Sequence, residues 1–193
     1  PPIVVPTFGA ESIIGTNPIA VAAPADKEPP FVFDAATSTV AGNKLTLAKR
    51  MGHDLEPGWI ADEEGTPIME PVPSPVEGYS GPSTLPLLPL GSTREMGSHK
   101  GYGFACIVDI LGGIISGGGY GANPGRPNFC HTVAAYSIEA FMDTAEFKRT
   151  MDEYLRMLAT SKPAKGHDRV LYAGLPEAEE EADRRERGIP LHN

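Results

Sequence analysis

The sequence predicts an α/β domain, because short β-rich runs alternate with turn signals and with helical patterns along most of the chain. The β-rich runs lie at residues 3–5, 19–22 and 31–33. A helix is expected over residues 40–51, where Gly52 supplies a stop signal. A second helix is expected over residues 101–116, which are apolar on nearly all sides and therefore predict a buried position.

The remaining parts of the first 140 residues are read from composition and alternation. The run at residues 31–33 is expected to be a buried strand, and HTVAAYSI at residues 131–138 fits another strand. Residues 56–91 are dense in proline and have no helical period, which predicts a long surface excursion. The glycine-rich residues 116–128 predict a loop.

The C-terminal part carries clear helix signals. DTAEF is a capping box in which Asp143 or Thr144 would cap a helix and Glu146 would reach back. A last helix is expected over residues 177–187, between Pro176 and Gly188. Its acidic first half and basic second half suit the helix dipole and allow i,i+4 ion pairs.

Charge and composition exclude several function classes. The net charge is −9, and an acidic domain of this kind repels phosphate backbones, which argues against a nucleic-acid partner. No apolar stretch reaches the about 18–20 residues of a membrane span. The two cysteines, Cys106 and Cys130, make no disulfide framework, so a reduced, cytoplasmic location is expected. The chain opens on Pro1 rather than Met, which suggests a fragment or a processed chain.

Several familiar site motifs do not occur in the sequence. The five histidines are isolated and lack HxxxH or CxxC companions, so no metal site is expected. There is no GxSxG elbow and no GxxxxGK[ST] phosphate loop. The glycine clusters do not have the strand–turn–helix context of a Rossmann fingerprint.

Two stretches could carry a binding site, and the first is FDAATS. Its small residues would let a ligand approach the backbone, Asp34 could accept hydrogen bonds from a ribose, and Thr37 and Ser38 could donate. The alternative is that Asp34, Thr37 or Ser38 is an ordinary helix cap. Residue types alone favour the cap.

The second stretch is GSHKGYGF, which places Lys100 near the N-terminus of the expected apolar helix. A cation opposes the helix dipole there unless an anion such as a phosphate lies between them. The alternative is that Lys100 points into solvent. On the residues alone an anion site is plausible, but the solvent-facing position is favoured.

A series of motifs in fixed order resembles one known family. The motifs are IIGTNPIAVAAPA, FVFDAATSTVAGNK, PGWIADEEGTP, LLPLG with HKGYG, and RVLYAGLPE with RERGIPL. Together they are similar to the malate/L-lactate dehydrogenase family, whose NAD(P)-binding fold is not Rossmann. The resemblance covers nearly the whole chain. It implies a non-Rossmann α/β domain over residues 1–136, a C-terminal helical segment over residues 137–193, and a homodimer with a composite active site.

The resemblance also implies which residues contact NAD or NADP. They form three segments: Asp34, Ala35, Ala36, Thr37 and Ser38; His99 and Lys100; Ala173, Gly174 and Leu175. The third segment departs from the family pattern of proline-glycine-glutamate and keeps only its glycine. The preference between NAD and NADP is left open.

The expected activity is hydride transfer between NAD(P) and a small 2-hydroxyacid or 2-ketoacid, with this chain supplying mainly the cofactor-binding part. The family's catalytic histidine and arginine would lie upstream of Pro1, so no catalytic residue is assigned within the chain. Two alternatives remain open: a cyclic imino acid reductase of the same family, and a non-catalytic cofactor-binding or assembly subunit.

Overall fold

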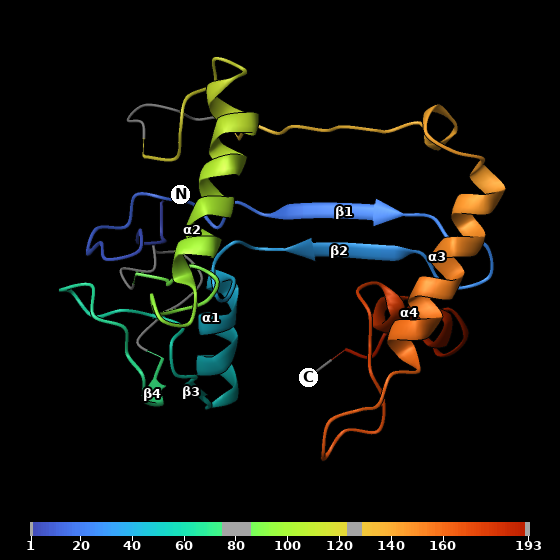
Figure 1. The fold of residues 1–193 in the computed structure, drawn as a ribbon. Coiled ribbons are helices and arrows are strands. Elements are labelled where there is room, and N and C mark those ends of the chain that lie inside the picture. Colours follow the sequence, from blue (N-terminus) through green and yellow to red (C-terminus); the bar gives the residue numbers. More distant parts are fainter. Residues whose placement is uncertain (1, 75–85, 123–128, 192–193) are drawn as a thin grey trace. The chain divides into compact units, whose positions relative to one another are not determined.

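The computed structural model describes residues 2–74, 86–122 and 129–191, and it divides the chain into two compact units (Figure 1). The first unit comprises residues 1–19 and 35–133, and the second comprises residues 20–34 and 134–193. The expected α/β class is confirmed, because short strands and longer helices both occur. The division into a cofactor domain over 1–136 and a helical segment over 137–193 stays a prediction.

The first unit is built on an apolar cluster beneath helix α1 (Gly42–Met51). Leu45 of α1, together with Leu55 and Leu87 of two extended segments, is fully buried in this cluster. Helix α1 ends as expected, because Gly52 adopts the left-handed conformation (φ 69°) and its N–H bonds to carbonyls of the last turn. Strands β3 (Asp54–Leu55) and β4 (Val72–Pro73) pair antiparallel beside it.

Single bridges, rather than long strands, join the extended segments of the first unit. Val4 bridges both Ile14 and Leu87, and Leu87 in turn bridges Ile60. The expected strand at residues 3–5 is therefore extended and paired, but only through these isolated bridges. The prolines among these segments remove backbone N–H donors, which keeps regular ladders short.

Helix α2 (Ser98–Val108) continues directly into a π-helical segment, η1 (Asp109–Ile114) (Figure 1). The expected helix over 101–116 is confirmed, but its expected burial is wrong. The buried positions belong to small residues, whereas the large apolar side chains are about half exposed, among them Phe104, Ile107, Ile110, Leu111 and Ile114. Glycine and alanine allow another backbone to approach closely, so α2 packs against its neighbours through the face that carries its small residues.

The second unit combines a hairpin with two helices. Strands β1 (Ile19–Ala23) and β2 (Phe31–Ala35) pair with each other, as expected near residues 19–22 and 31–33. The expected burial of β2 is wrong, since Val32 is 45% and Phe33 is 39% exposed. The hairpin forms a two-stranded sheet, so within the described residues neither edge gains a further strand.

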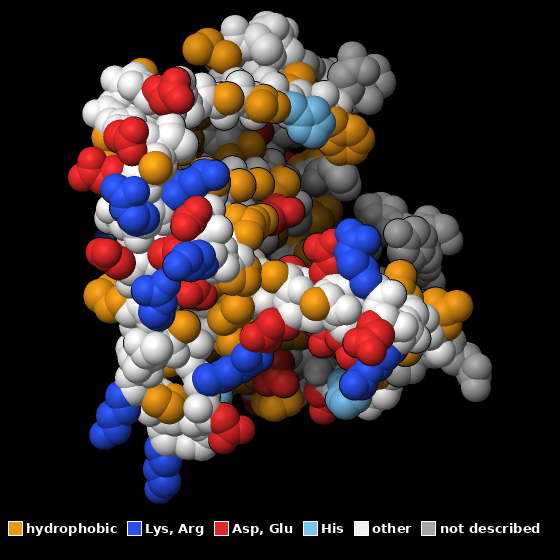
Figure 2. Space-filling model, turned by 90° about the vertical axis from the view of Figure 1, so that its right-hand side faces the viewer, with side chains coloured by type: hydrophobic (Ala, Val, Ile, Leu, Met, Phe, Trp, Pro, Cys, Tyr) orange, Lys and Arg blue, Asp and Glu red, His pale blue; other side chains and the backbone are white. Residues whose placement is uncertain are grey.

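Helix α3 (Thr144–Ala159) follows the short 3-10 helix η2 (Ile138–Ala140), and α4 (Leu175–Arg187) closes the unit. The expected cap of α3 is Asp143, whose Oδ1 accepts from the N–H of Glu146 at 2.9 Å. Helix α4 ends at Gly188 and forms the expected i,i+4 ion pairs, Glu180–Arg184 and Glu181–Arg185. Figure 2 shows acidic and basic side chains interspersed over one face of the molecule.

The strand expected over residues 131–138 is wrong. Residues 131–137 have no regular secondary structure, and Val133 and Tyr136 are 92% and 80% exposed. A β-rich composition needs a neighbouring strand to pair with, and the described part of the chain offers none there. The surface excursion expected over residues 56–91 is wrong at both described ends, because Ile60, Ala61, Leu87 and Leu88 are buried in the core. Its middle (75–85) and the end of the expected glycine-rich loop (123–128) lie outside the described residues.

Candidate functional site

The first predicted segment runs from the end of β2 into the first unit. Asp34 is exposed, and the side chains of Thr37 and Ser38 are buried. The Thr37 hydroxyl donates to the Thr16 carbonyl (3.0 Å), and the Ser38 hydroxyl donates to the Val40 carbonyl (2.7 Å). Both hydroxyl hydrogens are therefore used within the chain, so a ligand could approach this segment only through Asp34 and the backbone of its alanines.

The alternative interpretation of this segment as a helix cap does not hold for the helix that follows. Helix α1 begins only at Gly42, its N-cap is Ala41, and no side chain accepts a hydrogen bond from its first turn. The polar residues of FDAATS are thus separated from α1, and the hydroxyls of Thr37 and Ser38 hydrogen-bond to Thr16 and Val40 instead.

The second predicted segment forms the first turn of α2. His99 and Lys100 are both exposed, and Gly97 is the N-cap with φ 100°, a left-handed conformation that favours glycine. The Lys100 side chain lies back over this cap, since its Nζ would be 3.9 Å from a Cβ at Gly97. The lysine cation therefore lies at the N-terminal end of the helix rather than away from it.

A third basic group joins this turn. The Arg94 guanidinium contacts the His99 ring at 3.0 Å between Nη1 and Nδ1. Because arginine is always a donor, Nδ1 accepts this bond, which leaves Nε2 to face other groups. Arg94, His99 and Lys100 thus surround one helix N-terminus, where the dipole also favours an anion. The N–H groups of Ser98 and Lys100 already bond to loop carbonyls, so side chains would provide much of any anion contact.

The structure brings these two segments together through the strand-like residues that precede α2. Leu90 donates its N–H to the Thr37 carbonyl (2.9 Å), and Ser38 bridges Pro89. Leu90 also packs directly against Gly101 on the first turn of α2. FDAATS and HKGYG, more than 60 residues apart in sequence, therefore share one neighbour.

The third predicted segment lies in the second unit. The Ala173 carbonyl accepts from the N–H of Val32 in β2 (2.9 Å), and Gly174 lies against the same strand. Gly174 has φ 99° and is the N-cap of α4, whose first residue is Leu175. A Cβ at Gly174 would come within 2.8 Å of the Val32 nitrogen, which explains why the glycine is kept where its neighbours differ from the family pattern.

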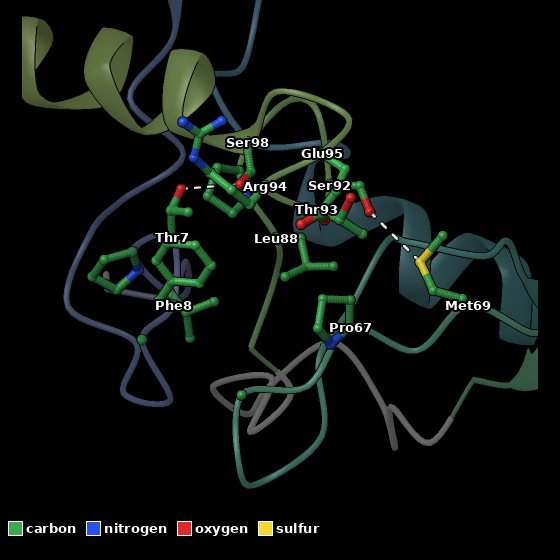
Figure 3. Close-up of a pocket in the computed structure, with 15 residues that line it drawn as sticks. Thr7, Phe8, Pro67, Met69, Leu88, Ser92, Thr93, Arg94, Glu95 and Ser98 are labelled. Carbon is green, nitrogen blue, oxygen red and sulfur yellow. Dashed lines mark hydrogen bonds between the residues drawn. The ribbon is translucent and has the colours of Figure 1, made fainter.

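A cavity of about 240 Å³ opens in the first unit beside the start of α2 (Figure 3). Phe8, Pro67, Met69 and Leu88 contribute apolar side chains to its lining, and Arg94 contributes the cation. The hydroxyls of Thr7 and Ser98, drawn in Figure 3, hydrogen-bond each other at 3.0 Å. None of the ten predicted cofactor residues lines this cavity, although Ser98 immediately precedes His99.

Two half-buried groups along α2, Tyr102 and Asp109, have shifted pKa values. Burial raises the pKa of Asp109 above its usual value, and a hydrogen bond from Asn17 offsets this only in part. The pKa of Tyr102 is also raised, first by the neighbouring Cys106 one turn along α2 and then by burial. Among the described residues, no group of three or more acidic, histidine or cysteine side chains could hold a metal ion.

Sequence reasoning missed Arg94, Thr16 and Asn17 as parts of this region. Arg94 gave no signal, since it lies in a loop and meets His99 only through the fold. Thr16 and Asn17 belong to GTNP (residues 15–18), a stretch with turn-forming residues, yet Thr16 accepts two hydrogen bonds from Thr37 and Asn17 bonds to α2. The position of GTNP within the ordered motifs was the one signal that could have drawn attention to them.

The described helices include none that is both long and apolar enough to cross a membrane.

Proteins with similar sequences include dehydrogenases and a reductase. The chain is 39% identical to a malate dehydrogenase from Pyrococcus abyssi over 99% of its own length and 52% of that protein. It is 37% identical to Delta(1)-pyrroline-2-carboxylate reductase 2 from Burkholderia multivorans, over 59% of this chain and 29% of the reductase.

The fold is similar to that of solved dehydrogenases. The crystal structure of malate dehydrogenase from Entamoeba histolytica matches with a TM-score of 0.79 and 30% identity, over 97% of this chain and 54% of that one. The chain thus spans about half the length of the relatives it matches. The family model described as malate/L-lactate dehydrogenase matches residues 1–193, and the chain belongs to the malate/L-lactate dehydrogenase family.

Proposed function

We propose that this chain supplies the cofactor-binding part of an NAD(P)-dependent oxidoreductase that interconverts a small 2-hydroxyacid and the corresponding 2-ketoacid. The observation that carries the proposal is the basic first turn of α2, with Arg94, His99 and Lys100 around a helix N-terminus. It occurs in a chain whose whole length matches a family of such dehydrogenases.

The residues of this turn fit the chemistry of a dinucleotide. The cofactor's pyrophosphate is an anion, and a helix N-terminus with an exposed lysine and histidine attracts one. Asp34, which is exposed, could accept hydrogen bonds from ribose hydroxyls, and Ala35 and Ala36 leave the backbone accessible. When bound, the cofactor supplies or accepts the hydride. Ala173, Gly174 and Leu175 are proposed as a further contact, through backbone atoms.

The remaining catalytic groups are proposed to lie outside the chain. Hydride transfer at a hydroxyl-bearing carbon also needs an acid/base for the hydroxyl proton and a cation for the neighbouring carboxylate. By family resemblance these are a histidine and an arginine upstream of Pro1. We also propose a cytoplasmic homodimer in which the active site is composite, and we leave the choice between NAD and NADP open.

Two other functions share the same cofactor residues. A cyclic imino acid reductase is favoured by the similarity to the Burkholderia reductase, whose name gives pyrroline-2-carboxylate as its substrate. A non-catalytic cofactor-binding or assembly subunit remains the second alternative, since it needs only the cofactor residues. Activity assays of a protein that includes the proposed segment upstream of Pro1, with small 2-hydroxyacids and with cyclic imino acids, distinguish the two enzymes. Cofactor binding by that longer protein without either activity supports the subunit.

The cofactor proposal is tested by fluorescence titration of the 193-residue chain with NADH and with NADPH. Lys100→Ala should weaken binding about tenfold or more, equivalent to ~1.4 kcal/mol. Lys162→Ala is a matched control, because Lys162 is an exposed lysine of the second unit outside the proposed contacts. Equal affinity of the Lys100 variant and the unaltered chain would remove Lys100 from the site, and no binding by the unaltered chain would overturn the cofactor proposal.

A further inference from the structure

Two successive residues of the GTNP turn hold the two predicted cofactor segments of the first unit. The Thr16 carbonyl accepts both the backbone N–H of Thr37 (2.8 Å) and its side-chain hydroxyl (3.0 Å). Thr37 is 4% exposed, so both bonds are shielded from competing water. The side chain of the next residue, Asn17, hydrogen-bonds to α2 instead.

Asn17 contacts α2 at the point where the α-helix becomes π-helical. Its Nδ2 donates to the Ala105 carbonyl at 2.9 Å, and the same side chain lowers the pKa of the Asp109 carboxyl against the effect of burial. The Ala105 carbonyl accepts the backbone N–H of Asp109 as well. One carbonyl near the end of α2 therefore accepts both the Asn17 amide and the N–H of the first residue of η1.

The turn places Asn17 in an unusual and well-defined conformation. Asn17 has φ 36°, in the left-handed region, and Pro18 restricts it further. A Cβ at Gly15 would lie 2.5 Å from the Asn17 Oδ1, so the side chain occupies space that only a glycine leaves free. A strained backbone persists where its surroundings determine it, and here the determining contacts are those to α2 and Thr37.

We propose that Asn17 is a positioning residue for the cofactor-binding surface: with Thr16 it ties residues 35–38 to helix α2, and so fixes His99 and Lys100 relative to that segment. This inference rests on the proposed cofactor role of both segments. Asn17 itself acts only through its neighbours. A site of this kind tolerates displacements of roughly 0.5 Å, so loosening the tie weakens binding although no binding residue is changed.

A purely structural role for Asn17 makes a different prediction. If the amide only stabilises the end of α2, its loss would loosen residues around 105–109 and leave Thr37 as it was. If Asn17 and Thr16 together connect residues 35–38 to α2, loss of the amide also loosens residues 35–38. The reason is that the strained turn carrying the Thr16 carbonyl is then no longer held against α2. The two roles are separated by measuring both segments at once.

The experiment compares Asn17→Ala with Asn43→Ala in the 193-residue chain. Asn43 is a matched control, since it is an exposed asparagine on α1. Hydrogen–deuterium exchange is followed in peptides covering 35–38 and 98–109. We expect exchange to accelerate about fivefold or more in both peptides for Asn17→Ala and in neither for Asn43→Ala. Acceleration confined to 98–109, or absent from both peptides, overturns the inference.

The same variants are then titrated with NADH. Weakening of about tenfold in Asn17→Ala, with Asn43→Ala unchanged, supports the positioning role, whereas unchanged affinity overturns it. If the unaltered chain binds no cofactor, the proposed function fails, while the exchange data still decide whether the tie exists. Should Asn17→Ala not fold, Asn17→Asp keeps the shape, loses the donors at neutral pH and receives the same two measurements.

Discussion

Gly101 and Leu90 are in backbone contact: a Cβ at Gly101 would lie 2.5 Å from the Leu90 nitrogen and closer still to its carbonyl oxygen. This contact seats the first turn of α2 on the segment whose N–H bonds to Thr37. Gly101 in HKGYG is therefore required by the approach of another backbone, and not by its own φ angle.

Gly101→Ala is expected to lower the free energy of unfolding by about 1–3 kcal/mol, because backbone atoms at Leu90 cannot move aside as a flexible side chain can. Gly103→Ala is the matched control on the same helix, since nothing lies within 4 Å of its Cβ position. That control should be neutral or stabilise by up to about 1 kcal/mol through helix propensity. Urea denaturation of both variants measures the difference, and equal midpoints would contradict the contact.

Local signals were sufficient where the structure depends on nearby residues. The stop of α1 at Gly52, the cap of α3 at Asp143 and the end of α4 at Gly188 are all found as expected. Each depends on one residue and on backbone groups within a few positions of it, so the sequence contains the whole interaction.

The burial of a helix face and the pairing of a strand could not be predicted in the same way. Both depend on which distant residues pack against the helix or lie beside the strand. The apolar run of α2 is buried only along its small residues, and the β-rich residues 131–137 have no partner strand in the described chain. The site shows the same limit, since the residue types allowed the Thr37 hydroxyl to donate to a ligand or to cap a helix, whereas it donates to the Thr16 carbonyl. Such contacts join residues about 20 to 90 positions apart, which local patterns do not encode.

Replacing the cap of α3 should have a modest, defined cost. The Asp143 carboxylate accepts the Glu146 N–H in the exposed first turn, so Asp143→Ala is expected to destabilise by about 1 kcal/mol. Asp143→Asn keeps the acceptor oxygen and should retain most of that stability. Thermal unfolding followed by circular dichroism checks both, and an alanine variant as stable as the unaltered chain would show that the cap contributes nothing.

Asp152 should make the stability of the second unit depend on acid pH. Burial alone would raise its pKa, but the backbone N–H groups of Glu28, Lys27 and Asp26, with Arg156, hold the pKa below its usual value. Its stabilisation is therefore complete above the usual carboxyl pKa and is lost as the pH falls through the lower value in the folded state. The unfolding temperature of the unaltered chain should therefore fall as the pH drops below the usual carboxyl pKa. The unfolding temperature of Asp152→Asn should fall less over the same pH range.

The control for Asp152 is Glu153→Gln, an exposed acid on the same helix. Between neutral and acid pH, the unfolding temperature of Glu153→Gln should fall by the same amount as that of the unaltered chain. A parallel acid dependence in Asp152→Asn would contradict the view that the 26–28 backbone is held by the ionised carboxylate.

Asp109 should show the opposite dependence, because its pKa in the folded chain is raised. Burial disfavours the carboxylate, and the hydrogen bond from Asn17 compensates only in part. The folded state therefore holds the proton more tightly than the unfolded state does, so stability declines as the pH rises from the usual carboxyl pKa through the raised one.

Asp109→Asn removes the charge and keeps an oxygen that can accept from Asn17. The variant should be more stable than the unaltered chain at pH about 7, and the difference should shrink toward pH about 4. Asp54→Asn, at an exposed acid of the same unit, should show no such trend in urea denaturation. A neutral-pH loss of stability in Asp109→Asn would mean that the ionised carboxylate itself is needed to hold Asn17 against α2.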